Sequence, residues 1–311
     1  MPAGTRSTTP PGTGRDSLCA VVLAAGEGRR LRPLTEHLPK ALCPVGNVPL
    51  LDRALLRVAG LGFAGPDTVA VNACYLGDQV VRHVRDRAWL SVEPGDPLGT
   101  SGGVARLRDW IDGRGVLVGN ADAYLAAPDA PPGPDIAALL DGWDGRTVRL
   151  LGQPVAGPAR PGDFGNHRFA GFSLLPWSRV VDLPTDPAEL VRTVWRPAEA
   201  AGELEVVEFV GTYLDTGTPA DYLAANLHAA GGGSLVDPSA TVTASPHRAV
   251  IGAGATVHGT VDRCVVWPGG VVRAGERLHE AVRVGTDLTV PAGVPPTPPG
   301  APSPGPARAN P

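Results

Sequence analysis

A six-residue spacing of apolar side chains dominates the last part of the chain. Five of them stand in one register, and two shorter pairs precede these: Val266, Val272, Leu278, Val284 and Val290, then Val236 with Val242 and Ile251 with Val257. A period of six is neither the helical period nor the strand period. It is typical of a parallel β-helix with triangular coils, so residues 235–291 predict about three coils of about 18 residues each. The break before Val266 predicts a slipped corner, and an ordinary antiparallel tail is the alternative.

A different pattern fills residues 18–230. Short apolar runs at 20–24, 68–72 and 115–119 are typical of strands that are buried on both faces. Between them, apolar residues recur at helical spacing over 50–61, and a second helix is expected over 79–87. Alternating strands and helices predict a mostly parallel, doubly wound sheet, which binds ligands at the carboxyl ends of its strands.

The two ends of the chain differ from both blocks. Residues 1–17 are rich in Thr, Ser, Pro and Gly, and residues 292–311 are rich in proline. Both compositions predict disordered tails. The first of them also lacks the apolar core of a signal peptide, and no apolar run approaches the roughly 18 residues of a membrane span.

Charge and cysteine content exclude several classes of function. The net charge of −4 and pI near 6.0 give no basic surface for nucleic acid. The four cysteines are far apart and form no CxxC pair: Cys19, Cys43, Cys74 and Cys264. They are expected to be buried thiols in a reducing compartment. A cytoplasmic protein without nucleic-acid or membrane partners is therefore predicted.

Lys40 is the only lysine in 311 residues, although Lys and Arg together number 27. It closes residues 23–40, LAAGEGRRLRPLTEHLPK, a glycine- and arginine-rich loop after the first predicted strand. Gly26 and Gly28 would let backbone N–H groups approach a phosphate, and three guanidinium groups follow: Arg29, Arg30 and Arg32. An ammonium can act as a point charge between phosphate oxygens. The loop therefore predicts a phosphate site with Lys40 at its centre.

The loop and four later segments resemble the sugar-1-phosphate nucleotidyltransferases, also called NDP-sugar pyrophosphorylases. After LAAGEGRRLRPLT…PK come residues 93–103 (EPGDPLGTSGG), 118–122 (VGNAD), 169–175 (FAGFSLL) and 211–226 (GTYLDTGTPADYLAAN). Each is similar to a family motif, and their order is the family's. A hexapeptide-repeat tail is common in one branch, which includes mannose-1-phosphate guanylyltransferase-like members. The resemblance implies a Rossmann-like doubly wound mixed sheet at 18–230 and a short left-handed parallel β-helix at 235–291.

The resemblance also implies a reaction and roles for residues. A nucleoside monophosphate would pass from an NTP to a sugar 1-phosphate with release of pyrophosphate. Arg30 and Lys40 would hold the reacting phosphates, while Asp122 and Asp215 would bind Mg²⁺, which prefers carboxylate and phosphate oxygens. The other expected nucleotide contacts are small residues of two loops: Ala24, Ala25, Gly26, Gly28, Gly99 and Thr100.

One departure from the family leaves alternatives open. Family members carry a second lysine that contacts the sugar phosphate, and here Arg160 or Arg168 is the candidate replacement. The missing lysine also allows a catalytically silent regulatory subunit that binds a nucleotide sugar beside an active paralogue. A third reading is transfer to a non-sugar phosphate such as phosphocholine. Base and sugar are not predicted, and the exposed end of the β-helix predicts a homo-oligomer.

Overall fold

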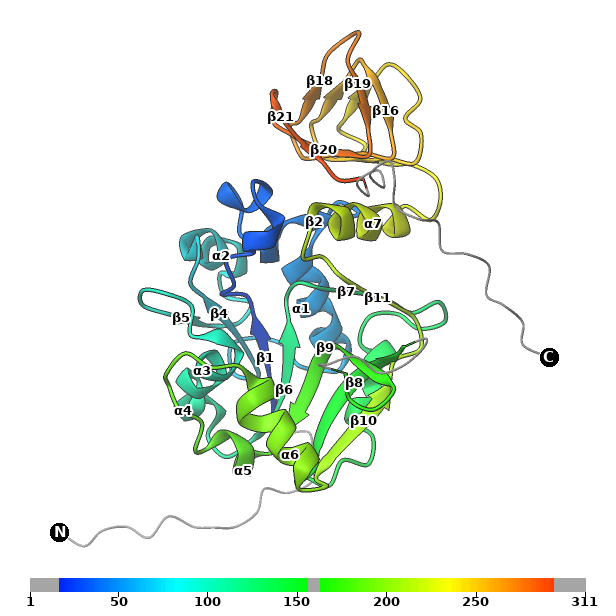
Figure 1. The fold of residues 1–311 in the computed structure, drawn as a ribbon. Coiled ribbons are helices and arrows are strands. Elements are labelled where there is room, and N and C mark those ends of the chain that lie inside the picture. Colours follow the sequence, from blue (N-terminus) through cyan, green and yellow to red (C-terminus); the bar gives the residue numbers. More distant parts are fainter. Residues whose placement is uncertain (1–16, 156–162, 294–311) are drawn as a thin grey trace, which may run out of the picture.

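The computed structural model describes residues 17–155 and 163–293. An α/β body and a smaller β-helical body are joined through one helix (Figure 1). Most of the two predicted tails, and Arg160, lie outside the described residues. Among the residues described, no helix is both long and apolar enough to cross a bilayer.

The α/β body is built on a seven-stranded sheet with the order β10-β8-β9-β6-β1-β4-β5. Its strands are β1 (Leu18–Leu23), β4 (Val69–Ala73), β5 (Trp89–Val92), β6 (Gly115–Asn120), β8 (Val148–Pro154), β9 (His167–Leu175) and β10 (Leu204–Glu208). Neighbouring strands run parallel except β9, which is antiparallel to both β6 and β8. The predicted doubly wound mixed sheet is confirmed.

Helices cover both faces of this sheet. One face packs against α1 (Leu50–Gly60), α2 (Gly77–Val84) and the 3₁₀ helix η5 (Pro134–Leu139). The other packs against α3 (Gly99–Arg106), α4 (Arg108–Ile111), α5 (Trp177–Val180), η6 (Val191–Trp195) and α6 (Arg196–Ala200). Ala20 and Val22 point to the first face and Cys19 and Val21 to the second, all fully buried. A continuous apolar run in β1 is the consequence of this burial on both sides.

The predicted helices differ from the observed ones mainly at their ends. The helix expected over 50–61 is α1, which ends at Gly60. The helix expected over 79–87 is α2, which begins two residues earlier and ends at Val84. Arg85 has φ 54°, outside the helical region, so the chain leaves the helix there.

Short elements on the β1 side shape the ligand-binding end of the sheet. They are η2 (Arg29–Leu31), η3 (Leu34–Glu36), η4 (Lys40–Leu42), β2 (Pro44–Val45), β3 (Val48–Pro49), β7 (Ala123–Ala126) and β11 (Thr212–Asp215). β2 and β3 form a small hairpin. β11 pairs antiparallel with β7, and the register sets Asp215 opposite Ala123. This pairing brings Asp215 next to Asp122 from a point more than ninety residues away.

The second body is a parallel β-helix, as predicted. Its strands are β12 (Leu235–Val236), β13 (Thr241–Val242), β14 (Val250–Ile251), β15 (Thr256–Val257), β16 (Thr260–Asp262), β17 (Val265–Val266), β18 (Val271–Val272), β19 (Arg277–His279), β20 (Ala281–Val284) and β21 (Leu288–Pro291). Leu235 pairs with Val250 and Val250 with Val265, so these coils advance by fifteen residues. The predicted length of about 18 residues per coil is therefore too long for these coils. Val261 is buried between Val257 and Val266, which shortens the third face of the coil.

The register of the last coil also differs from the six-residue prediction. Val266 pairs with Arg283, so Val284 does not continue the inward stack. Val284 and Val290 instead belong to an antiparallel hairpin, β20–β21, which packs toward the α/β body. The Arg283 side chain is buried and donates to the carbonyl oxygens of Val271 and Thr286. A guanidinium thus takes the inward place because it can satisfy backbone carbonyls where the coils end.

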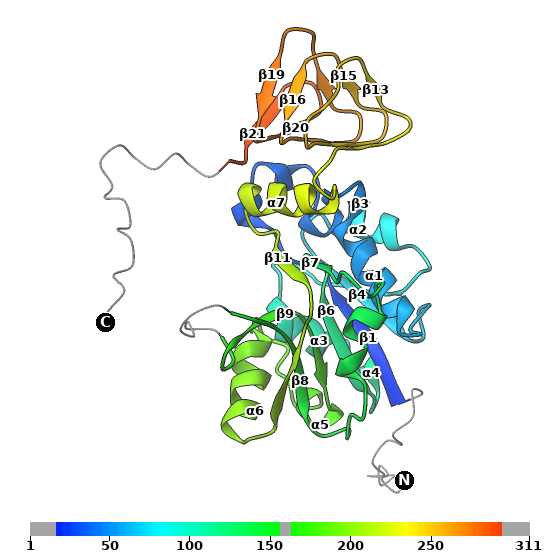
Figure 2. The same ribbon diagram turned by 90° about the vertical axis from the view of Figure 1, so that its right-hand side faces the viewer.

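Helix α7 (Pro219–Ala229) lies between the two bodies (Figure 2). The side chain of Thr218 caps its first turn by accepting from the backbone N–H of Asp221 at 3.2 Å. Tyr222 on this helix is fully buried, donates to the Pro44 carbonyl, and accepts from Trp267 Nε1 at 3.0 Å. One tyrosine therefore contacts both bodies.

All four cysteines are free, as predicted. Cys19, Cys43 and Cys264 are buried, whereas Cys74 is only half-buried. Burial raises the pKa of the Cys19 and Cys43 thiols to about 12, so both stay protonated at neutral pH.

Candidate active site

A pocket of about 610 Å³ opens at the carboxyl ends of β1, β4 and β6. Leu23, Asn72 and Asn120 mark these strand ends on its wall. The remaining lining residues come from the segments that follow the strands and from residues 187–192, which run into η6: Ala24, Ala25, Gly26, Gly28, Arg29, Arg30, Lys40, Ala41, Pro97, Gly99, Thr100, Ala121, Asp122, Pro187, Ala188, Glu189, Arg192 and Gly217. This position is the one expected for a ligand of a doubly wound sheet.

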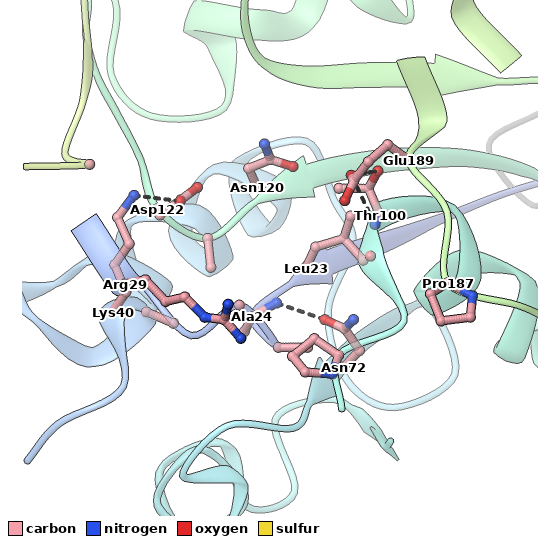
Figure 3. A pocket seen from close by; sticks show the side chains of 18 of the residues that line it. Leu23, Ala24, Arg29, Lys40, Asn72, Thr100, Asn120, Asp122, Pro187 and Glu189 are labelled. Carbon is pink, nitrogen blue, oxygen red and sulfur yellow. Dashed lines mark hydrogen bonds and ion pairs between the residues drawn. The ribbon is translucent and has the colours of Figure 1, made fainter. Parts of the chain in front are cut away.

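Lys40 joins the two predicted metal ligands. Its Nζ donates to Asp122 Oδ2 at 2.7 Å and lies 3.5 Å from Asp215 Oδ1. Arg30 Nη2 lies 3.2 Å from the other oxygen of Asp215. Figure 3 shows Lys40 reaching Asp122 across one end of the pocket. Two cationic and two anionic groups therefore meet here, and their charges balance.

The glycine-rich loop packs closely against the Lys40 side chain. Lys40 is 7% exposed. A Cβ at Gly28, which has φ 61°, would lie 2.9 Å from Lys40 Cβ, so only glycine allows the loop to cross here. Thr35 stabilises this close approach of Gly28 to Lys40, because its hydroxyl donates to the Gly28 carbonyl at 3.0 Å.

The other arginines of the loop have different partners. Arg29 lines the pocket, but its guanidinium donates to both carboxylate oxygens of Glu27, at 2.5 and 2.8 Å. Arg32 lies 3.6 Å from the same carboxylate. The hydrogen bonds from Arg29 lower the pKa of Glu27, which keeps this carboxylate charged. Of the three loop arginines, only Arg30 contacts the Lys40 cluster.

The two aspartates lie at one end of the strand pair β7–β11: Asp122 directly precedes β7, and Asp215 is the last residue of β11. The buried Thr216 hydroxyl donates to the Asp122 carbonyl at 2.9 Å, which fixes the ends of the two strands together. Tyr213 on β11 lies near this cluster; burial first, and then the charges of Asp215 and Asp122, raise its pKa well above the usual value. Its phenol therefore stays neutral beside the carboxylates.

At the opposite end, the pocket wall is held by hydrogen bonds, of which those of Asn72 are buried. The Ala24 N–H donates to Asn72 Oδ1 at 2.7 Å, and Asn72 Nδ2 donates to Glu93 Oε1 at 2.7 Å. Thr100 donates its hydroxyl to Glu189 Oε2 at 2.6 Å and accepts from the Leu190 N–H at 2.8 Å. Figure 3 shows both groups facing the same cavity. The charged side chains that line the pocket here are Glu189, which accepts from Thr100, and Arg192.

The donor set at the charged end fits a small divalent cation. Magnesium is usually bound by one or two carboxylates, with phosphate oxygens and water completing its octahedral shell. Asp122 and Asp215 supply two carboxylates, which are 39% and 49% exposed. Among the described residues no group of three or more His, Cys, Asp or Glu could hold a metal alone. A cation here would therefore need water or phosphate oxygens to complete its shell.

Most of the predicted site residues line this one pocket. Nine of the ten do so: Ala24, Ala25, Gly26, Gly28, Arg30, Lys40, Gly99, Thr100 and Asp122. Asp215 joins through its contacts with Arg30 and Lys40. Their chemical roles stay predictions, since distances alone test none of them.

The candidates for the second cation are less well placed. Arg168 is not among the lining residues, and its Nε lies 3.8 Å from Asp163 Oδ1. Arg160 lies outside the described residues. Arg192, which sequence reasoning missed, does line the pocket. Asn72 and Asn120 were missed too, although a polar residue at the end of an apolar strand is a usable signal.

Comparison with known proteins agrees with this geometry. Residues 20–166 match the family model described as the MobA-like NTP transferase domain. This part of the chain therefore carries an NTP transferase domain. A crystal structure from Bacillus anthracis, described as a glucose-1-phosphate thymidylyltransferase, is similar with a TM-score of 0.56 and 18% identity, over 68% of this chain and 95% of that one. At this identity the likeness shows the fold alone.

Curated relatives are named as sugar-1-phosphate enzymes. An N-acetylmuramate alpha-1-phosphate uridylyltransferase of Neisseria meningitidis is 36% identical over 33% of this chain and 46% of its own length. A protein of the same name from Caulobacter vibrioides is 29% identical over 66% of this chain and 94% of its own. A mannose-1-phosphate guanyltransferase of Schizosaccharomyces pombe is 28% identical over 66% and 62%. The chain thus spans about half the length of the Neisseria relative and nearly all of the Caulobacter one.

Proposed function

We propose that this nucleotidyltransferase transfers a nucleoside monophosphate from an NTP to a sugar 1-phosphate in a Mg²⁺-dependent reaction. The observation that carries the proposal is the meeting of Lys40, Arg30, Asp122 and Asp215 at one end of the pocket. The names of the relatives support the sugar 1-phosphate as acceptor. The Neisseria and Caulobacter proteins are named uridylyltransferases and the Schizosaccharomyces protein a guanyltransferase, so these names do not identify the nucleotide base.

The reaction joins two anions, so neutralising and aligning phosphates is the main task of the protein. A phosphate oxygen of the sugar 1-phosphate attacks the α-phosphorus, and the bond to the β-bridging oxygen breaks as pyrophosphate leaves with the electron pair. Arg30 and Lys40 would neutralise the phosphates, with Gly26 and Gly28 allowing close backbone approach. Asp122 and Asp215 would hold Mg²⁺, which supplies charge neutralisation when bound.

The other end of the pocket suits the base. Ala24 and Ala25 present backbone and small side chains there, opposite Gly99 and Thr100 at the start of α3. Small residues leave room for a flat ring between two loops. The Thr100 hydroxyl already has both a donor and an acceptor partner, so it would shape the wall more than read the base.

The test is pyrophosphate release from the full chain with Mg²⁺, a panel of NTPs and a panel of sugar 1-phosphates. Hexose, N-acetylhexosamine and N-acetylmuramate 1-phosphates cover the acceptors, and phosphocholine covers the non-sugar alternative. We expect turnover with at least one sugar 1-phosphate and a drop of about a hundredfold or more in Lys40→Ala. Arg146→Ala, an exposed arginine remote from the pocket, is the control. A silent wild type in every combination would favour the regulatory alternative.

A further inference from the structure

Two buried polar residues, Asn72 and Glu93, support the base end of the pocket. Asn72 is 2% exposed and Glu93 is 4% exposed. Asn72 is in β4 and Glu93 directly follows β5, so they come from neighbouring parallel strands. Asn72 lines the pocket, whereas Glu93 is not among the lining residues. Any effect of Glu93 on a ligand must therefore pass through other residues.

The donor and the acceptor of each hydrogen bond in this pair can be assigned. The Ala24 N–H can only donate, so the amide oxygen of Asn72 must face it, at 2.7 Å. The amide nitrogen then faces Glu93 Oε1 at 2.7 Å. The other oxygen, Glu93 Oε2, accepts from the Leu98 N–H at 2.8 Å. Both oxygens of Glu93 thus meet donors, which a carboxylate satisfies and a primary amide does not.

This pair, the Asn72–Glu93 relay, connects the two loops that face each other across the pocket. At one end it holds Ala24, in the loop after β1. At the other it holds Leu98, immediately before Gly99 and Thr100 at the start of α3. A carboxylate at this helix N-terminus is also favoured by the helix dipole. The spacing of the two loops therefore depends on the relay.

The side chains of the relay are tightly packed against the backbone of α3. A Cβ at Gly103 would lie 2.6 Å from Asn72 Nδ2 and 3.1 Å from Glu93 Oε1, so the backbone of α3 lies directly on both side chains. Neither residue has an unsatisfied polar atom among the described residues. A buried network that is fully satisfied and tightly packed holds its members rigidly.

We propose that Glu93 is a positioning residue, which acts through Asn72 and Leu98 to set the width of the slot for the nucleotide base. The effect on nucleotide binding rests on the proposed function, whereas the pairing itself does not. If the slot changes width, NTP binding suffers first. The phosphate chemistry at Lys40 lies at the other end of the pocket and is less affected.

The experiment exchanges the two chemical groups. Glu93→Gln leaves one acceptor oxygen for two donors, and Asn72→Asp sets two carboxylates against each other. In the double variant the carboxylate at position 72 accepts from the Ala24 N–H and from the amide at position 93, whose oxygen accepts from the Leu98 N–H. Every donor then has an acceptor again. We expect each single variant to raise the KM for NTP about tenfold with kcat changed less than about threefold, and the double variant to return KM to within about threefold of wild type.

Asn226→Asp is the matched control. Asn226 is likewise fully buried, accepts from the Gly46 N–H at 3.0 Å, and donates to the Tyr222 carbonyl, but it lies at the junction of the two bodies. It should lower the melting temperature without raising the KM for NTP. Equal rises in KM for this control and for Glu93→Gln would show general destabilisation and overturn the proposal.

Melting temperatures of the same variants without nucleotide test the pairing separately. Both single variants should melt lower, and the double variant should recover most of the loss. Additive losses in melting temperature, or a double variant that regains stability while its KM stays high, would refute the positioning role. If the wild type turns over no NTP, the proposed function fails, yet the recovery in melting temperature still decides whether the relay exists.

Discussion

Replacing Lys40 with methionine should let the protein bind a free divalent cation that the wild type holds weakly. The ammonium lies 2.7 Å from Asp122 Oδ2 and 3.5 Å from Asp215 Oδ1, where a bound cation would compete with it. A pair of unit charges about 4 Å apart interacts by roughly 4 kcal/mol at an effective dielectric near 20. Because the carboxylates are 39% and 49% exposed, about half of that is a reasonable net value. A difference of about 2 kcal/mol corresponds to roughly thirtyfold in Kd.

The assay is titration of nucleotide-free protein with Mn²⁺, followed by electron paramagnetic resonance of the free ion. Lys40→Met should bind Mn²⁺ about thirtyfold more tightly than wild type. Lys40→Arg retains the charge and should resemble wild type. Arg30→Met should change the affinity less, because Asp215 is the one carboxylate among the described residues that this guanidinium contacts, and the side chain is 67% exposed. If Lys40→Met binds no more tightly than wild type, the ammonium does not compete with a cation, and the assignment of the two aspartates as metal ligands is wrong.

Three further substitutions test the junction of the two bodies, the relay and the β-helix. Tyr222→Phe removes the acceptor of Trp267 Nε1 between the two bodies and should cost about 1–3 kcal/mol in urea unfolding; no loss would mean that the junction tolerates the unpaired group. Gly103→Ala would push a methyl group into the relay and should raise the KM for NTP, whereas Gly77→Ala, whose Cβ meets nothing closer than 3.8 Å, should not. Hydrogen bonds from His247 and His279 lower the pKa of the Asp262 carboxyl. The contribution of Asp262 to the free energy of unfolding is therefore fully present above about pH 4, and it is lost as the pH falls through the lowered pKa. The stability gap between wild type and Asp262→Asn, measured by urea unfolding, should therefore narrow on acidification.

The fold followed from the sequence where one physical requirement dominated. Burial on both faces forces continuous apolar strands, and these located β1, β4 and β6 within a residue or two. The repeat located the β-helix because stacked coils need one inward apolar residue per face. Its register failed at Arg283, since a charged residue breaks the apolar pattern although hydrogen bonds to carbonyls let it point inward. Patterns of hydropathy carry no information about such compensation.

Some residues of the candidate site could likewise be predicted from the sequence, and others could not. Lys40 and the glycine loop could be found from sequence because their residue types are unusual and adjacent, whereas the pairing of Asp122 with Asp215 depends on the β7–β11 register. Glu93 stands first in the segment 93–103, but glutamate is rarely buried and its sequence context does not indicate that this side chain is only 4% exposed. What fixes it is the N–H of Ala24, which dictates the amide orientation of Asn72 and so demands an acceptor at position 93. The need for an acceptor at position 93 arises only because Ala24, Asn72 and Glu93, from three separate segments, meet in the folded chain. The sequence of any one segment does not reveal it.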